Sequence, residues 1–132
     1  MEKSVDIKFE DKITPANISY TDSPPWSVVL YDEEGVVVRS DGDDLFDALI
    51  NLRNKLEKKG ALIMCHGARR DVYPSAMSRN MGGGVMAYQL TVGEPARRTD
   101  MVNIFDRCDD SRIASPEEQE SFYKSWLDSL KS

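Results

Sequence analysis

Residues 26–60 read WSVVLYDEEGVVVRSDGDDLFDALINLRNKLEKKG, a β-hairpin pattern that runs directly into a helical one. Apolar residues at 26–31 and 36–38 flank the sequence Asp-Glu-Glu-Gly at 32–35. Gly35 can adopt the positive φ that closes a short hairpin loop, because glycine has no Cβ. We therefore expect two antiparallel strands joined by a tight, acidic turn.

The second half of this stretch predicts an amphipathic helix. Residues 41–44, Asp-Gly-Asp-Asp, provide a capping oxygen and negative charge for its first turn. The helix should end near Lys58-Lys59-Gly60, because lysine suits the C-terminal end of the helix dipole and glycine suits the C-cap. Its apolar stripe consists of Leu45, Leu49, Leu52 and Leu56.

A second helix is predicted near the C-terminus. Ser115-Pro116-Glu117-Glu118 forms a capping box with proline at the first helical position. The residues expected on its buried face are Phe122, Tyr123, Trp126, Leu127 and Leu130.

Four further segments have the pattern of strands. Residues 5–9 alternate apolar and polar side chains with period two, and other strand candidates lie at 61–66, 85–92 and 102–105. Strand and helix patterns follow one another without an internal repeat, which favours an α+β fold. We expect one domain over residues 1–132, with an antiparallel or mixed sheet of about five or six strands and two main helices packed on it.

Composition is typical of one globular domain. The 132 residues include 23 acids and 17 bases, and no apolar run approaches the ~20 residues of a membrane span. Acids stand at the N-terminus where a secretory signal has a basic patch, so we expect a cytoplasmic protein that does not bind a membrane. Cys65 and Cys108 lack metal-ligand spacing and are expected to be reduced thiols, with a single disulfide as the alternative.

Residues 67–84 form an 18-residue stretch without a helix or strand pattern, and structureless connections of this length are uncommon unless they are functional. Arginine, tyrosine and methionine are enriched at recognition surfaces. The candidate partner-binding residues here are Arg69, Arg70, Tyr73 and Arg79. The alternative is that Tyr73 and the methionines pack beneath the loop while the arginines pair with the chain's own acids.

Residues 22–47 are strongly acidic, with eight acids and one base. Such a field repels nucleic acid and attracts a basic protein over roughly 8–10 Å in physiological salt. The alternative is that these acids only keep the surface soluble. Aspartates at 41–47 lack the spacing of a calcium-binding loop, so no metal site is predicted. The candidate partner-binding acids are Asp32, Glu33, Glu34, Asp41, Asp43 and Asp44.

No catalytic arrangement is evident. The only histidine, His66, follows Cys65 in a predicted strand, where neighbouring side chains point to opposite faces and cannot form a nucleophile and base pair. The three glycines at 82–84 lack the lysine and hydroxyl residue of a phosphate-binding loop. We therefore expect a protein that is not an enzyme and that uses no cofactor.

The block Cys65 to Ser75, continuing through Met77-Ser78-Arg79, Met81 to Gly84 and Ala87-Tyr88, resembles a block in small bacterial immunity proteins encoded beside polymorphic toxins. Val102-Asn103-Ile104-Phe105-Asp106 and the capped helix from Ser115 are similar to the same group, which includes proteins of contact-dependent growth inhibition systems. This resemblance covers residues 61–130. It implies a cytosolic binder that occludes the active site of one cognate toxin domain, often a nuclease, and that carries no catalytic residues.

A second hypothesis is a small-ligand or nucleotide-binding protein, or an enzyme, that uses the arginines of Gly67–Gly84. His66-Gly67 is similar to the histidine-glycine pair of ADP-ribosyltransferases, and Arg69, Arg70 and Arg79 could hold a phosphate. No late glutamate matches that family. The sequence leaves the oligomeric state and the contacting surface open.

Overall fold

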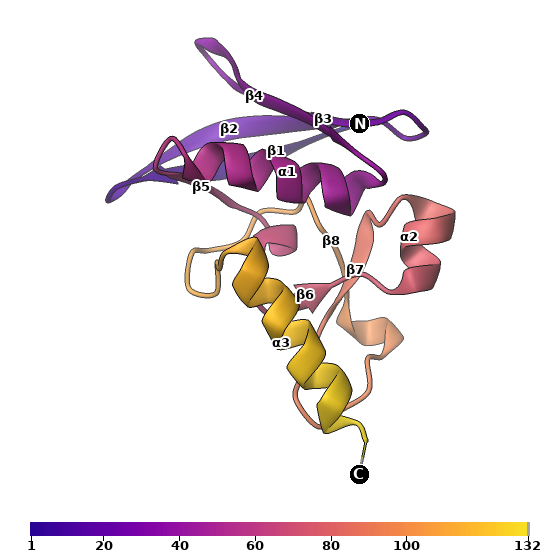
Figure 1. Cartoon of the computed structure of the whole chain (residues 1–132). Helices are drawn as coiled ribbons and strands as arrows, with labels where there is room; N and C mark the ends of the chain where they lie inside the picture. Colours follow the sequence, from indigo (N-terminus) through magenta and orange to yellow (C-terminus); the bar gives the residue numbers. More distant parts are fainter. Residues whose placement is uncertain (132) are drawn as a thin grey trace.

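The computed structural model describes residues 1–131, and its strands form two separate antiparallel sheets (Figure 1). The larger sheet has the order β4-β3-β2-β1-β5 and the smaller has the order β6-β7-β8. The larger sheet consists of β1 (Glu2–Phe9), β2 (Lys12–Tyr20), β3 (Trp26–Asp32), β4 (Gly35–Gly42) and β5 (Ala61–Met64). The smaller consists of β6 (Val72–Tyr73), β7 (Met86–Gln89) and β8 (Met101–Asn103). The predicted α+β class is confirmed, with the strands divided between two sheets instead of joined in one.

The helices lie between and beside these sheets. Figure 1 shows α1 along one face of the larger sheet, with α3 and the smaller sheet on the far side of α1. In residues 1–131 no helix is long and apolar enough to cross a bilayer. The helical elements are α1 (Leu45–Glu57), α2 (Ala76–Gly82), α3 (Pro116–Ser129) and the 3₁₀ turns η1 (His66–Ala68) and η2 (Arg98–Asp100).

The hairpin and the helix predicted from residues 26–60 are both confirmed. Gly35 has φ +118° in the turn between β3 and β4. Asp44 caps α1, because its Oδ1 accepts a hydrogen bond from the Asp47 N–H at 2.7 Å. All four leucines of the predicted stripe are buried. Burying each leucine contributes about 1.5–3 kcal/mol, so this stripe is what attaches α1 to the sheet.

The core lies between the larger sheet and α1 and continues toward the smaller sheet. Alternate residues of the larger sheet's strands are buried on one face, as period-two geometry requires. Tyr20 of β2 stacks on Phe105 at a centroid distance of 4.2 Å. This contact connects the larger sheet to the segment that follows β8. The other buried contributors include Val5, Ile7, Ile18, Val28, Leu30, Val72, Ala87 and Ile104.

Two side chains of α1, and that of Lys59 just beyond its end, donate hydrogen bonds to the outer backbone of β4, which is an end strand of the larger sheet. The acceptors are alternate carbonyls, and the donors are four residues apart in the sequence. The pairs are Asn51 Nδ2 to Asp41 O (2.9 Å), Lys55 Nζ to Arg39 O (2.8 Å) and Lys59 Nζ to Val37 O (3.2 Å). At the other end of the sheet, Arg107 forms a β-bridge with Cys65, directly after β5.

The prediction that residues 67–84 lack secondary structure is wrong, because this stretch contains most of η1, β6 and α2. Ser75 Oγ caps α2 by accepting a hydrogen bond from the Ser78 N–H at 3.0 Å. Gly83 ends α2 with φ +70° and lies against the Trp26 ring, where a Cβ would come within 2.8 Å of the ring. No side chain of α2 is buried, so the helix has no apolar periodicity to detect.

Two other expectations differ from the structure. Strand β2 was not predicted from the sequence. Its N-terminal half is exposed and contains Pro15, so its alternation of apolar and polar residues is weak. On α3, Trp126 is buried as predicted and Phe122 and Tyr123 are half-buried, whereas Leu127 and Leu130 are exposed. The fully buried residue of this helix is Gln119.

Candidate functional site

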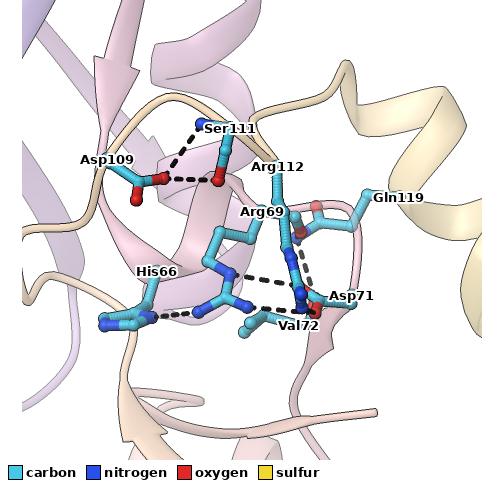
Figure 2. Close-up of polar contacts among 8 residues, drawn as sticks. All are labelled: His66, Arg69, Asp71, Val72, Asp109, Ser111, Arg112 and Gln119. Atoms are coloured by element: carbon cyan, nitrogen blue, oxygen red, sulfur yellow. Dashed lines mark hydrogen bonds and ion pairs between the residues drawn. The ribbon is translucent and has the colours of Figure 1, made fainter. Parts of the chain in front are cut away.

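Asp71 is the centre of a charged network that follows β5 (Figure 2). Its carboxylate is buried and accepts two hydrogen bonds from Arg69, Nε at 3.0 Å and Nη2 at 3.0 Å. Arg112 Nη1 donates to the same carboxylate at 2.7 Å. Asp109 closes the turn before Arg112 by accepting from the N–H and the hydroxyl of Ser111. Two guanidinium groups therefore share one carboxylate, which leaves a net positive charge.

His66 contacts the same network as a neutral base. Arg69 Nη1 lies 3.1 Å from His66 Nδ1, and a guanidinium can only donate, so Nδ1 accepts and the ring proton is on Nε2. Burial of the ring, followed by the nearby charge of Arg69, lowers the pKa of His66. This environment stabilises the uncharged imidazole.

Both cysteines are free, and both are held in the protonated form. Burial raises the pKa of Cys65 to about 12 and the pKa of Cys108 to about 11. A protonated thiol is a poor nucleophile, because the thiolate is the reactive species. Cys65 is buried, and the half-buried Cys108 keeps a raised pKa although the nearby charge of Arg69 lowers it in part.

A buried polar cluster, formed by Arg53 of α1 and Gln119 of α3, joins these helices to the segment after β5. Gln119 Oε1 accepts from Arg53 Nη1 at 2.7 Å. Gln119 Nε2 donates to three backbone carbonyls, those of Gly67 (2.8 Å), Arg69 (2.9 Å) and Val72 (2.8 Å). Arg53 also donates to the carbonyls of Gly67 (3.3 Å), Ala68 (3.4 Å) and Ala114 (2.6 Å).

Arg53 has no carboxylate partner within residues 1–131. Burial without a counter-ion lowers the pKa of Arg53 to about 10. Its hydrogen-bond partners are amide and carbonyl oxygens, so the loss of even one of these bonds should lower the stability of the fold markedly. The sequence analysis missed both members of this cluster. A signal existed, because Arg53 and Gln119 occupy buried positions of helical stripes that are otherwise apolar.

Three of the four candidate residues in 67–84 are used inside the fold. Arg69 binds Asp71, as described above. Tyr73 stacks on Tyr123 at 4.0 Å, and Arg79 Nε donates to Asp44 at 2.7 Å. The packing alternative stated from the sequence therefore describes these three residues. Only Arg70 is exposed, with its guanidinium 5.0 Å from the centre of the Phe122 ring.

The candidate acids divide into three groups. Asp32, Glu33 and Glu34 form the turn between β3 and β4, and Asp32 Oδ1 accepts from the Glu34 N–H at 2.9 Å. Asp41 and Asp43 are exposed at the opposite end of β4, beside the start of α1. Asp44 is buried, caps α1 and pairs with Arg79, so it is not available to a partner. Within residues 1–131 the first two groups form no ion pair with a lysine or arginine.

Two methionines of α2 are strongly exposed. Met77 is 71% exposed and Met81 is 83% exposed, and their spacing of four residues places them on one face of the helix. The end of α2 is held against the start of α1, because the Leu45 N–H donates to Gly83 O at 2.7 Å. The exposed methionines therefore lie on a helix whose C-terminal end is fixed against α1.

In the part of the chain that the structure describes, no three His, Cys, Asp or Glu side chains are grouped to hold a metal ion. No family model matches the chain, and no curated protein matches it.

Proposed function

We propose that this chain is a cytoplasmic, immunity-type protein that binds a cognate basic toxin domain of the nuclease class and occludes its active site. The observation that carries the proposal is the set of five carboxylates at both ends of β4, four exposed and one half-buried, that have no cationic partner within residues 1–131. Asp44 and Asp71 are paired with arginines of the same chain, whereas these five carboxylates are not. The five are therefore available to pair with a positively charged molecule.

A nuclease domain is a suitable partner because it must carry a cationic cleft to hold phosphates. Unpaired acids at such a cleft compete with the nucleic acid and speed the encounter, toward ~10⁸ M⁻¹s⁻¹ at low salt. The protein's net charge of −6 also favours a positively charged partner over nucleic acid. The resemblance of residues 61–130 to immunity proteins supports the same class of function.

The contact surface that we favour is the α1–α2 end, defined as Asp41, Asp43, Met77 and Met81. Affinity comes mainly from a few desolvated anchors, and charges around them add rate and specificity. The α1–α2 end supplies both, because two flexible methionines can fill apolar depressions while the carboxylates meet basic side chains. The acids of the turn at 32–34 lie roughly 20–25 Å away along β4, which places them at the rim of a contact of ordinary size.

Genetic rescue tests the class of function. The reading frame adjoining the gene is expressed alone and together with this chain, and survival of the cells is measured. We expect a basic domain that kills the cells alone and is tolerated with this chain. Survival unchanged by this chain would contradict the proposal. So would turnover of a metabolite by the purified chain that the His66→Ala substitution abolishes.

Binding kinetics with that purified basic domain test the surface. Replacing Met77 and Met81 with alanine should raise the dissociation rate by about tenfold or more, because desolvated anchors act on the bound state. Met101→Ala is the matched control, since this methionine is also exposed but lies on β8. Equal dissociation rates for the α2 variant and the control would exclude the α1–α2 end.

The turn acids should act on association instead. Reversing Asp32, Glu33 and Glu34 to lysine should slow association by about tenfold or more at low salt and should have little effect at high salt. The control reverses Glu117, Glu120 and Asp128, three exposed acids of α3, and therefore changes the net charge equally. If both triple variants slow association equally, net charge alone matters and the turn has no steering role.

A further inference from the structure

A hollow lies beside the Asp71 network. Its volume is about 670 Å³, within the range of about 300–1,000 Å³ that is usual for small-molecule sites. Four segments form its walls: residues 70–71, 89–92, 111–114 and the first half of α3. These residues do not overlap with the α1–α2 end. Toxin binding at that end therefore does not explain the hollow.

Two arginines on neighbouring chain segments line the hollow. The Arg70 N–H donates to the Arg112 carbonyl at 2.8 Å, and the neighbouring residues Arg69 and Ile113 form an antiparallel bridge. Residues directly opposite each other on an antiparallel pair direct their side chains to the same face. Arg70 and Arg112 both line the hollow accordingly.

Both guanidinium groups have hydrogen-bond donors to spare. Arg112 uses Nη1 to bind Asp71, and within residues 1–131 its Nε and Nη2 make no hydrogen bond. The guanidinium of Arg70 makes none within the same residues and rests over the Phe122 ring at 5.0 Å. A stacked and an ion-paired guanidinium are both oriented in advance, which lowers the entropy cost of binding an anion.

The charge count limits the ligand. Two arginines, Arg70 and Arg112, and two acids, Asp71 and Glu118, line the hollow, so its lining has no excess charge. Glu118 remains ionised, because hydrogen bonds from Ser115 lower its pKa. A balanced lining in a protein of net charge −6 suits one anionic group held by directed hydrogen bonds, and it disfavours a polyphosphate or a nucleic acid.

Part of the lining is apolar. Phe122, Leu90 and Ile113 contribute to it, so the hollow can accommodate an apolar body beside an anionic group. Forked guanidinium donors match the planar oxygen pair of a carboxylate, which can accept two parallel hydrogen bonds. We infer that this hollow is a binding site for a small monocarboxylate with an apolar or aromatic body, held by Arg70 and Arg112.

Isothermal titration calorimetry on the full chain tests the inference with three carboxylate probes, 3-phenylpropionate, indole-3-acetate and hexanoate. At least one probe should bind with 1:1 stoichiometry. The corresponding neutral amide should bind about tenfold more weakly or worse, because a charged hydrogen-bonded pair contributes more than a neutral one. Phenyl phosphate and ATP complete the series, and both should bind more weakly than the best carboxylate.

Two variants locate the site. Arg70→Gln should weaken carboxylate binding by about tenfold and should leave the melting temperature unchanged, since Arg70 is exposed and its guanidinium makes no hydrogen bond within residues 1–131. Arg39→Gln is the matched control, because Arg39 is an exposed arginine on β4. The inference is overturned if no carboxylate binds saturably or if the amide binds as well. It is also overturned if phenyl phosphate or ATP binds more tightly, or if Arg70→Gln and Arg39→Gln have the same affinity. None of these results depends on whether the chain neutralises a toxin.

Discussion

Replacing Gln119 with methionine should destabilise the protein far more than its position on a solvent-facing helix suggests. Methionine has nearly the same length and volume, so the substitution removes hydrogen bonds without opening a large cavity. Three bonds from Nε2 to backbone carbonyls are lost, together with the bond that Oε1 accepts from Arg53. Within residues 1–131 every buried side-chain nitrogen and oxygen has a partner, whereas the variant would weaken the satisfaction of Arg53 and of these backbone carbonyls.

The expected loss follows from those four bonds. A neutral hydrogen bond contributes about 1 kcal/mol net and a bond to a charged group about 1.5–3 kcal/mol. Because the side-chain amide has only two N–H donors for its three carbonyls, we count these contacts as two full bonds and expect the free energy of unfolding to fall by about 4 kcal/mol. This is a large part of the roughly 5–15 kcal/mol that holds a typical domain together. For a chain of this length the melting temperature should fall by roughly 10–15 °C.

Urea denaturation followed by tryptophan fluorescence and circular dichroism measures the change. Gln89→Met is the matched control, because Gln89 is a half-buried glutamine whose side chain makes no hydrogen bond within residues 1–131, and it should change stability by less than about 0.5 kcal/mol. A loss below about 1 kcal/mol in Gln119→Met would refute the reasoning. It would mean that water or a shifted side chain satisfies Arg53 equally well.

Three further predictions concern single residues. The pKa of His66 should lie below its unfolded value of about 6.5, so stability is fully present above that pH and decreases as the pH falls through 6.5 toward the folded-state pKa. As the only histidine, His66 gives one imidazole signal in an NMR titration, and a pKa at or above 6.5 would contradict the burial and Arg69 effects. Gly83→Ala should lower the free energy of unfolding by about 1–3 kcal/mol, because alanine is strained at φ +70° and its Cβ would clash with the Trp26 ring. Gly82→Ala, with open space around it, is the thermal-melting control, and equal melting temperatures would exclude the clash. Cys65 should resist Ellman's reagent at pH 8 until urea unfolds the chain, because its pKa is about 12, and rapid labelling of the native protein would contradict its burial.

The sequence predicted those elements whose signals are local. Asp44, Gly35 and Ser115 each act within a few residues of their own position, so the hairpin and the two long helices could be located from the chain alone. The division into two sheets could not be predicted, because it depends on which strands pair after the chain has folded. The short strand β6 has only two residues, which is too few for a periodic pattern.

The candidate site was less predictable, because partners distant in sequence decide which charges remain free. Arg79 pairs with Asp44, 35 residues away, and Arg112 pairs with Asp71 across 41 residues. Composition shows the surplus of acids but does not show which of them the fold neutralises. Gln119 was missed for the same reason, since its four partners come together only in the tertiary structure.

The hydrogen bonds that β4 accepts from α1 and Lys59 affect how this protein can bind other molecules. The main chain of an end strand is ordinarily a template on which a foreign strand, or another copy of the same chain, can add itself. Here the carbonyls at 37, 39 and 41 are already occupied by Lys59, Lys55 and Asn51. Recognition at this edge must therefore operate through side chains, and the protein can accumulate to high concentration with little tendency to polymerise through β4.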